Sequence, residues 1–171
     1  MTRLRRGERG VGLIEVLISV LLLSVGLLAA ARMQVQSLRS SQAAYHRSQA
    51  WFMATDMVDR MRANFAGALA GAYDGASTSD AASDPGCGAR ACDSTAIAEQ
   101  DVREWSARLY PLGREGEFMP LLPSVESIDA AGVVERVDEG VYRVTVSWAE
   151  PDGFGHRRAS LAMDFATEVR E

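Results

Sequence analysis

A single acidic residue, Glu15, lies inside a long apolar segment, and its position makes it the strongest candidate for a functional residue in this chain. The segment covers residues 11–31, and Glu15 is its only charged side chain. A carboxylate in such surroundings requires a cation or strong hydrogen-bond donors as its partner. The sequence therefore predicts that Glu15 has a binding partner, without identifying it.

The two cysteines, Cys87 and Cys92, are separated by four residues within a stretch rich in Ala, Gly, Ser and Asp. This spacing does not match the C-x-x-C redox motif, and two cysteines cannot build a four-ligand zinc site. In an oxidising compartment they can form a disulfide, which would stabilise so short a loop by about 2 kcal/mol. We expect a structural disulfide that stiffens the loop at residues 67–95.

Catalysis is not expected. The two histidines, His46 and His156, are far apart in the sequence, and the carboxylates are scattered. No pattern of nucleophile and base, phosphate-binding loop or metal-ligand spacing is present. The sequence therefore predicts no enzymatic activity, no cofactor and no metal site.

The composition is that of one folded domain with a distinct N-terminal end. The chain has 171 residues, of which 47% are hydrophobic and 24% charged, and all 18 basic residues are arginine. Its net charge of −5 argues against a nucleic-acid binder, which would carry a basic patch. The first ten residues carry a net charge of +3 and the remainder −8, which indicates a targeting or processing segment at the start.

The apolar segment at residues 11–31 would form a helix roughly 30 Å long, about the thickness of a bilayer core. The arginines before it place the N-terminus on the cytoplasmic side. Three interpretations compete: a secretory signal cut after Ala31, a plain anchor that keeps residues 1–10, and a prepilin-type leader. A signal peptide has a shorter apolar region, and a plain anchor gives Glu15 a cost without a purpose.

The stretch Arg9–Val16, RGVGLIEV, resembles the class III leader of type IV pilins and type II secretion pseudopilins. In that family a short basic leader ends in Gly, and a Glu stands fifth in the mature chain. The resemblance implies cleavage by prepilin peptidase between Gly10 and Val11, followed by N-methylation of Val11, which stands where the family usually has Phe. It also implies that the Glu15 carboxylate meets the N-terminal amine of a neighbouring subunit during assembly. In this sequence Val11 and Glu15 are four residues apart and share a helix face.

Helical signals continue far beyond the apolar segment. The chain has no Pro before Pro85 and no Gly between Gly26 and Gly67, which predicts one helix from about Gly12 to Asn64. Its second half carries an apolar stripe that would pack on a domain. The stripe consists of Ala50, Ala54, Met57, Met61 and Phe65, widened by Trp51 and Val58.

The rest of the chain predicts a short amphipathic helix at residues 95–109, capped by Ser94 or Thr95, and three strands. Alternation places the strands at residues 133–137, 142–148 and 159–165, the last two as a hairpin. The fold class is therefore α+β, a long N-terminal helix packed on a small antiparallel sheet, as in type IV pilins. We expect a leader at residues 1–10, a transmembrane half-helix at 11–31, an amphipathic half-helix at 32–65 and a periplasmic globular domain at 66–171.

Two runs in the long helix, residues 43–50 and 54–64, resemble the PilV-type minor pilins, also called type IV pilus modification proteins. The second run carries four charged side chains whose purpose the sequence leaves open, Asp56, Asp59, Arg60 and Arg62. They form either a solvated face with pairs four residues apart, such as Asp56 with Arg60, or a docking surface for a partner pilin.

The resemblance implies a minor pilin that is anchored in the inner membrane by one span and later enters the pilus. Its implied partners are other minor and major pilins, prepilin peptidase, the inner-membrane assembly platform and a tip adhesin. The implied role is priming of pilus assembly at the tip, with adhesion and twitching motility downstream. A minor pseudopilin of a type II secretion system shares the leader, fold and mechanism and is the alternative.

Overall fold

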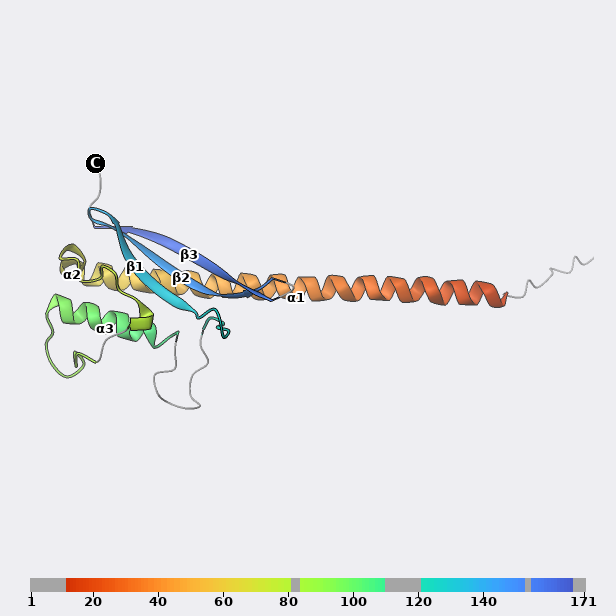
Figure 1. Cartoon of the computed structure of the whole chain (residues 1–171), viewed down its shortest axis with the longest axis horizontal. Helices are drawn as coiled ribbons and strands as arrows, with labels where there is room; N and C mark the ends of the chain where they lie inside the picture. The colour runs from red at the N-terminus through yellow and green to blue at the C-terminus, as the bar shows by residue number, and fades with distance from the viewer. Residues whose placement is uncertain (1–11, 81–83, 110–120, 153–154, 168–171) are drawn as a thin grey trace, which may run out of the picture. The chain divides into compact units, whose positions relative to one another are not determined.

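A computed structural model describes residues 12–80, 84–109, 121–152 and 155–167 of the chain (Figure 1). The contacts divide the chain into two compact units, Met1–Gln42 and Ala43–Glu171. The elements in chain order are α1 (Leu13–Ala63), α2 (Phe65–Leu69), the 3-10 helix η1 (Thr78–Asp80), α3 (Ser94–Ser106), β1 (Ala131–Asp138), β2 (Val141–Pro151) and β3 (His156–Ala166). The predicted α+β class is confirmed.

The first unit contains the N-terminal part of α1, which begins at Leu13. Its large apolar side chains are exposed, and the most apolar window of the helix has a mean hydropathy of 2.6. By length and composition α1 could therefore cross a membrane. A signal sequence has the same apolar character.

In the second unit, one face of α1 forms part of the core. Its buried residues are Ala50, Met53, Ala54, Met57, Val58 and Met61. The predicted stripe is confirmed except at its edges, since Trp51 and Phe65 are about half exposed. Trp51 lies at the margin of the buried face, and Phe65 lies outside α1, which ends at Ala63.

The sheet has the order β1-β2-β3 with both pairs antiparallel. Alternate residues of β2 form the other side of the core, and they are Tyr142, Val144, Val146 and Trp148. The three predicted strands are confirmed, each extended by a few residues at its ends. In Figure 1 the strands lie along the part of α1 that belongs to the second unit, and α3 lies beside the same part of the helix.

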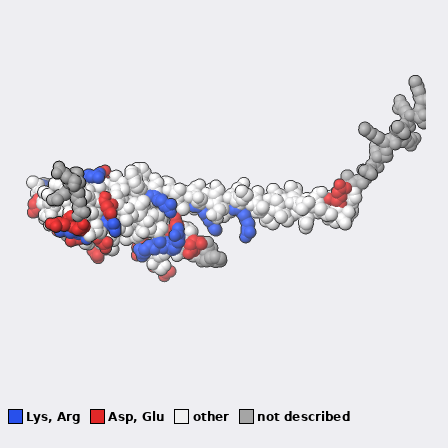
Figure 2. Space-filling model, turned by 90° about the horizontal axis from the view of Figure 1, so that it is seen from above, with Lys and Arg blue, Asp and Glu red and all other residues white. Residues whose placement is uncertain are grey.

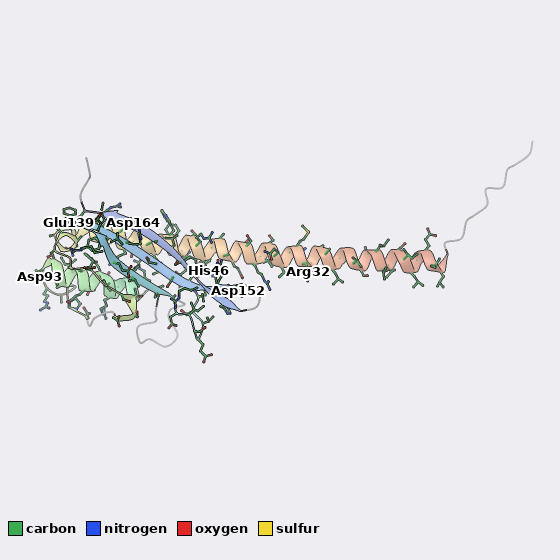
Figure 3. The ribbon with its side chains drawn as sticks, turned by 45° about the horizontal axis from the view of Figure 1, so that its top comes forward. Arg32, His46, Asp93, Glu139, Asp152 and Asp164 are labelled. Carbon is green, nitrogen blue, oxygen red and sulfur yellow. A yellow bond between two sulfur atoms is a disulfide. The ribbon has the colours of Figure 1, made fainter. Side chains whose placement is uncertain are left out.

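The short helix α3 begins at Ser94, and its N-cap is Asp93 (Figure 3). The Asp93 carboxylate accepts hydrogen bonds from the backbone N–H groups of Thr95 and Ala96 at 3.1 and 2.8 Å. The prediction of Ser94 or Thr95 as the cap is wrong. Asp93, one residue before Ser94, has an equally favoured capping side chain and takes this position. The loop predicted at residues 67–95 also contains short helical pieces, part of α2 and all of η1.

Candidate functional site

Glu15 lies in the first turn of α1. Its backbone is part of the helix, where Glu15 N–H donates to the Gly12 carbonyl at 2.9 Å and Ser19 Oγ donates to the Glu15 carbonyl at 2.7 Å. Its exposed carboxylate forms no hydrogen bond or ion pair with another described residue. The predicted cleavage and methylation positions, Gly10 and Val11, lie outside the described residues.

The stretch that follows Glu15 is almost free of charge. Figure 2 shows one acidic group at the start of this helix, followed by a white surface until the first arginines. These arginines, Arg32 and Arg39, are exposed and seven residues apart, which places them on the same side of the helix. The described residues of the first unit thus present one side-chain carboxylate, on an apolar helix that nothing in the described chain covers.

In the second unit, Arg60 of α1 binds three carboxylates, two of which lie on α3 and connect the two helices. Its guanidinium donates to Asp56 at 3.0 Å, to Asp101 at 3.2 Å and to Glu104 at 2.8 Å. Arg108 adds a further contact, 3.2 Å from the Asp56 carboxylate. Partial burial lowers the pKa of Arg60, but the hydrogen bonds to the carboxylates raise it further, so its pKa lies above the ordinary value.

Tyr73 and Asn64 extend this cluster into the interior. The buried Tyr73 hydroxyl donates to Asp101 at 2.6 Å and accepts from Asn64 Nδ2 at 3.0 Å. Asn64 also donates to the carbonyl of Ser94, the first residue of α3, at 2.7 Å. Burial and then the hydrogen bond to Asp101 raise the pKa of Tyr73, so it stays neutral and available as a donor. We call Asn64, Asp56, Arg60, Tyr73, Asp101 and Glu104 the α1–α3 network.

The structure separates the four side chains for which docking was predicted. Asp56 and Arg60 belong to the α1–α3 network, with side chains 26% and 19% exposed. Asp59 and Arg62 pair with each other at 2.9 Å and are 62% and 61% exposed. Docking therefore stays a prediction for Asp59 and Arg62, whereas Asp56 and Arg60 are already engaged within the chain.

Asp101 and Tyr73 are central to the network, but neither was predicted from the sequence as a functional residue. Asp101 stands three residues before Glu104, so both carboxylates share one face of α3 and can meet one guanidinium. That spacing was readable in the sequence. Tyr73 carried no such signal, because it reaches Asp101 through the fold of the segment after α2.

The predicted disulfide is present between Cys87 and Cys92. Cys92 directly precedes Asp93, the cap of α3, and Asp84 on the other side of the pair lies 3.7 Å from Arg103 of α3. The disulfide thus limits the freedom of the segment that leads into the α1–α3 network. Within the described part of the chain, no group of three or more His, Cys, Asp and Glu side chains could hold a metal.

The network predicts a specific loss of stability in acid. Hydrogen bonds from Gln100 and then Arg60 hold the pKa of Glu104 below its ordinary value of 4.5. A carboxyl group with a lowered pKa in the folded state stabilises it above the unfolded-state pKa and loses this contribution as the pH falls further. Thermal unfolding of the wild type and of Glu104→Gln between pH 6 and 3 measures the effect. We expect the midpoints to converge as the pH falls below about 4.5; parallel curves would show that Glu104 does not contribute.

Two family models match the chain, one after the other. The model described as the prokaryotic N-terminal methylation motif matches residues 5–31, and the model of the type IV pilin Tt1218 matches residues 32–103. No curated protein matches the chain, and no solved structure does. The matched stretches contain Glu15 in the first case and the disulfide with most of the α1–α3 network in the second. Together the two matches cover residues 5–103 and support a type IV pilin with an N-terminal methylation motif, and the α+β fold is consistent with that of type IV pilins.

Proposed function

We propose that this chain is a minor pilin of the type IV pilus, processed by prepilin peptidase between Gly10 and Val11 and methylated on Val11. The observation that carries the proposal is Glu15, an exposed carboxylate without a described partner, at the start of an uncovered apolar helix that matches the methylation motif. Such a helix is stable in a bilayer or against other apolar helices, but not in water.

Before assembly, the subunit spans the inner membrane once, with its N-terminus in the cytoplasm and its folded domain in the periplasm. The disulfide between Cys87 and Cys92 supports an oxidising location for that domain. During assembly the apolar helix leaves the bilayer and packs against the helices of other pilins. Glu15 then pairs with the N-terminal amine of a neighbouring subunit.

The minor role rests on the likeness of residues 43–50 and 54–64 to the PilV-type minor pilins. In this role the subunit joins other minor pilins in a complex that primes the pilus at its tip, contacts the assembly platform and the major pilin, and carries a tip adhesin. Adhesion and twitching motility follow from that position. The match to a type IV pilin model favours the pilus over a type II secretion system.

The experiment is mass spectrometry of the intact protein and its peptides, from native membranes and from sheared pili. We expect a mature chain that begins at methylated Val11, present in pili at far lower copy number than the major pilin. A chain that begins at Met1 or at Arg32 would overturn the proposal. A methylated chain that is absent from pili would indicate a pseudopilin instead, and one as abundant as the main subunit would indicate a major pilin.

A further inference from the structure

The two edges of the sheet differ in whether their backbone groups are satisfied. Along β1, three N–H groups point away from β2, and each has an acceptor in the segment 74–78. Gly132 donates to Thr78 Oγ1 at 2.9 Å, Val134 to the Ala76 carbonyl at 2.8 Å and Arg136 to Asp74 Oδ1 at 3.1 Å. The chain itself therefore closes this edge.

The strand register shows which backbone groups β3 presents at the opposite edge. Backbone groups alternate in direction along a strand, so β1 residues between those three, such as Val133, bond to β2. Val133 therefore bonds to its partner on β2, Thr145. The residue before Thr145, Val144, points its backbone groups the opposite way and bonds to its own partner on β3, Met163. The N–H and C=O groups that point away from β2 are those of Arg158, Ser160, Ala162 and Asp164.

None of these outward backbone groups bonds to another described residue. The strand β3 spans 11 residues, His156–Ala166, and in Figure 1 it is the outer strand of the sheet. Natural proteins usually shorten, cover or bend an edge of this length, because it is a template for pairing with another chain. An exposed strand edge is a place where an extended peptide can add a further strand to a sheet.

The apolar side chains of β3 that face the core are covered on one side only. Leu161 and Met163 pack against the core but are only partly buried. Their partners on β2, Val146 and Val144, are completely buried. A further strand beside β3 would bury the rest of the Leu161 and Met163 side chains, which is favourable in proportion to the apolar area covered.

The helix α1 supplies a wall next to this edge. Its Arg62 guanidinium lies over the ring of Phe165, near the end of β3, at 5.7 Å from the ring centroid. Trp51 precedes Arg62 by 11 residues, about three helical turns, so it lies on the same side of α1. Its indole is 48% exposed although it borders the core. A strand added to β3 would therefore pass along a half-exposed tryptophan.

The end of this edge near the β2–β3 turn carries arginines, and the turn itself also carries the acidic Asp152 (Figure 3). Arg47 lies one turn before Trp51 on α1, is exposed and has no acidic partner among the described residues. Arg157 is paired with the buried Glu150, whereas among the described residues Arg158 donates to the neutral Ser147 hydroxyl alone, at 3.3 Å. In Figure 2 basic side chains gather on one part of the folded domain, with acidic side chains next to them. A segment that binds here is expected to carry acidic residues at this end.

We propose that the open edge of β3 binds an extended segment of another pilus subunit as a fourth strand of the sheet. The segment has apolar residues at alternate positions, which cover Leu161 and Met163, and a carboxylate near Arg158. The backbone of this segment forms hydrogen bonds with the outward N–H and C=O groups of β3, which are those of Arg158, Ser160, Ala162 and Asp164.

We do not expect a second copy of this chain as the partner. Two β3 edges paired antiparallel would point their α1 helices in opposite directions, whereas subunits of one pilus leave the same membrane in the same direction. The edge of β1 is closed, so β3 of one copy cannot continue onto β1 of the next. This argument, and the assignment of the partner to the pilus, rest on the proposed function.

Hydrogen exchange of the full-length chain tests the proposal directly. The chain is measured in detergent micelles and in sheared pili enriched through a tag on this subunit, and peptides covering β1 and β3 are compared. We expect the four outward amides of β3, those of Arg158, Ser160, Ala162 and Asp164, to exchange at least about tenfold more slowly in pili. The amides of β1 serve as an internal control, because they are bonded in both states.

A pair of substitutions at one position provides the second arm. Ala162→Pro removes one outward donor and leaves the bonds to β2 intact, whereas Ala162→Ser keeps the donor and serves as the matched control. We expect Ala162→Pro to lower incorporation into pili at least about fivefold at equal membrane levels, and Ala162→Ser to match the wild type. Resistance of both variants to protease in membranes checks that the domain is folded.

The outcomes separate this proposal from the function on which it rests. A chain that is methylated and present in pili, but whose β3 amides exchange as fast as in micelles, overturns the fourth strand alone. Slow β3 exchange that grows with concentration in the purified chain would show self-pairing and also overturn it. A chain that is neither methylated nor found in pili overturns the proposed function, and the choice of partner falls with it.

Discussion

Replacing Trp105 by alanine is expected to lower the free energy of unfolding of the second unit by about 3–5 kcal/mol. Trp105 is completely buried on α3, and its indole N–H donates to the Met53 carbonyl of α1 at 3.0 Å. Its ring also lies directly against Gly132 of β1. One side chain thus contacts α1 and the sheet, and the cavity left by its loss would separate α3 from both. Pulse proteolysis of the full chain across a urea series measures the change.

Two further variants make this prediction specific. Trp51→Ala removes the same side chain from a half-exposed position and is expected to cost less than about 1.5 kcal/mol. Gly132→Ala adds a methyl group where the Trp105 ring lies and is expected to destabilise the domain by about 1–3 kcal/mol. If Trp105→Ala costs no more than Trp51→Ala, α3 is not anchored to α1 through this residue.

The periodic parts of the fold were predictable from the sequence because one physical rule controls each of them. Burial of one face gives β2 its alternation of apolar and polar residues from Tyr142 to Trp148, with Ser147 of the polar set also buried, and gives α1 its stripe at steps of three and four. The exposed apolar half of α1 was predictable for a simpler reason, since Glu15 is the only charged residue between Leu13 and Ala31. These elements need no knowledge of their partners.

The parts that failed depend on contacts between segments distant in sequence. Arg60 could be placed on α1, but not the carboxylates of α3, 41 and 44 residues away, that bind it. The half-exposure of Trp51 could not be predicted either, because it depends on the sheet ending at β3. Periodicity identifies the face that is buried, but not how wide the partner is that buries it.

The need of Glu15 for a partner was predictable from the sequence alone, and the structure adds little to it. Glu15 is exposed at the start of α1, and its described surroundings contain no cation. The residues predicted to supply the amine, at the cleavage position between Gly10 and Val11, lie outside the described residues. What the structure adds is the continuity of the helix from Leu13 onward, which fixes Glu15 in its first turn.

Glu15→Ala is expected to lower the amount of this subunit in sheared pili at least about tenfold, while cleavage of the leader continues. Once the helix is packed among other apolar helices, an N-terminal amine that has lost its carboxylate is an unpaired charge in apolar surroundings. At mid-bilayer depth such a charge costs about 2.5–3.5 kcal/mol, which corresponds to a change in equilibrium of roughly 70- to 400-fold. Quantitative immunoblots of membrane and pilus fractions, with the mature N-terminus checked by mass spectrometry, measure the result.

Two controls isolate the role of the carboxylate in this experiment. Ser19→Ala changes the same helix four residues further on, where the hydroxyl donates only to the Glu15 carbonyl, and is expected to leave incorporation unchanged. Glu8→Gln neutralises a carboxylate in the proposed leader, and it too is expected to match the wild type in pili. Because both controls keep Glu15, a loss confined to Glu15→Ala assigns assembly to this one side chain. Wild-type levels of Glu15→Ala in pili would show that the amine finds another partner, and the role assigned to Glu15 would be wrong.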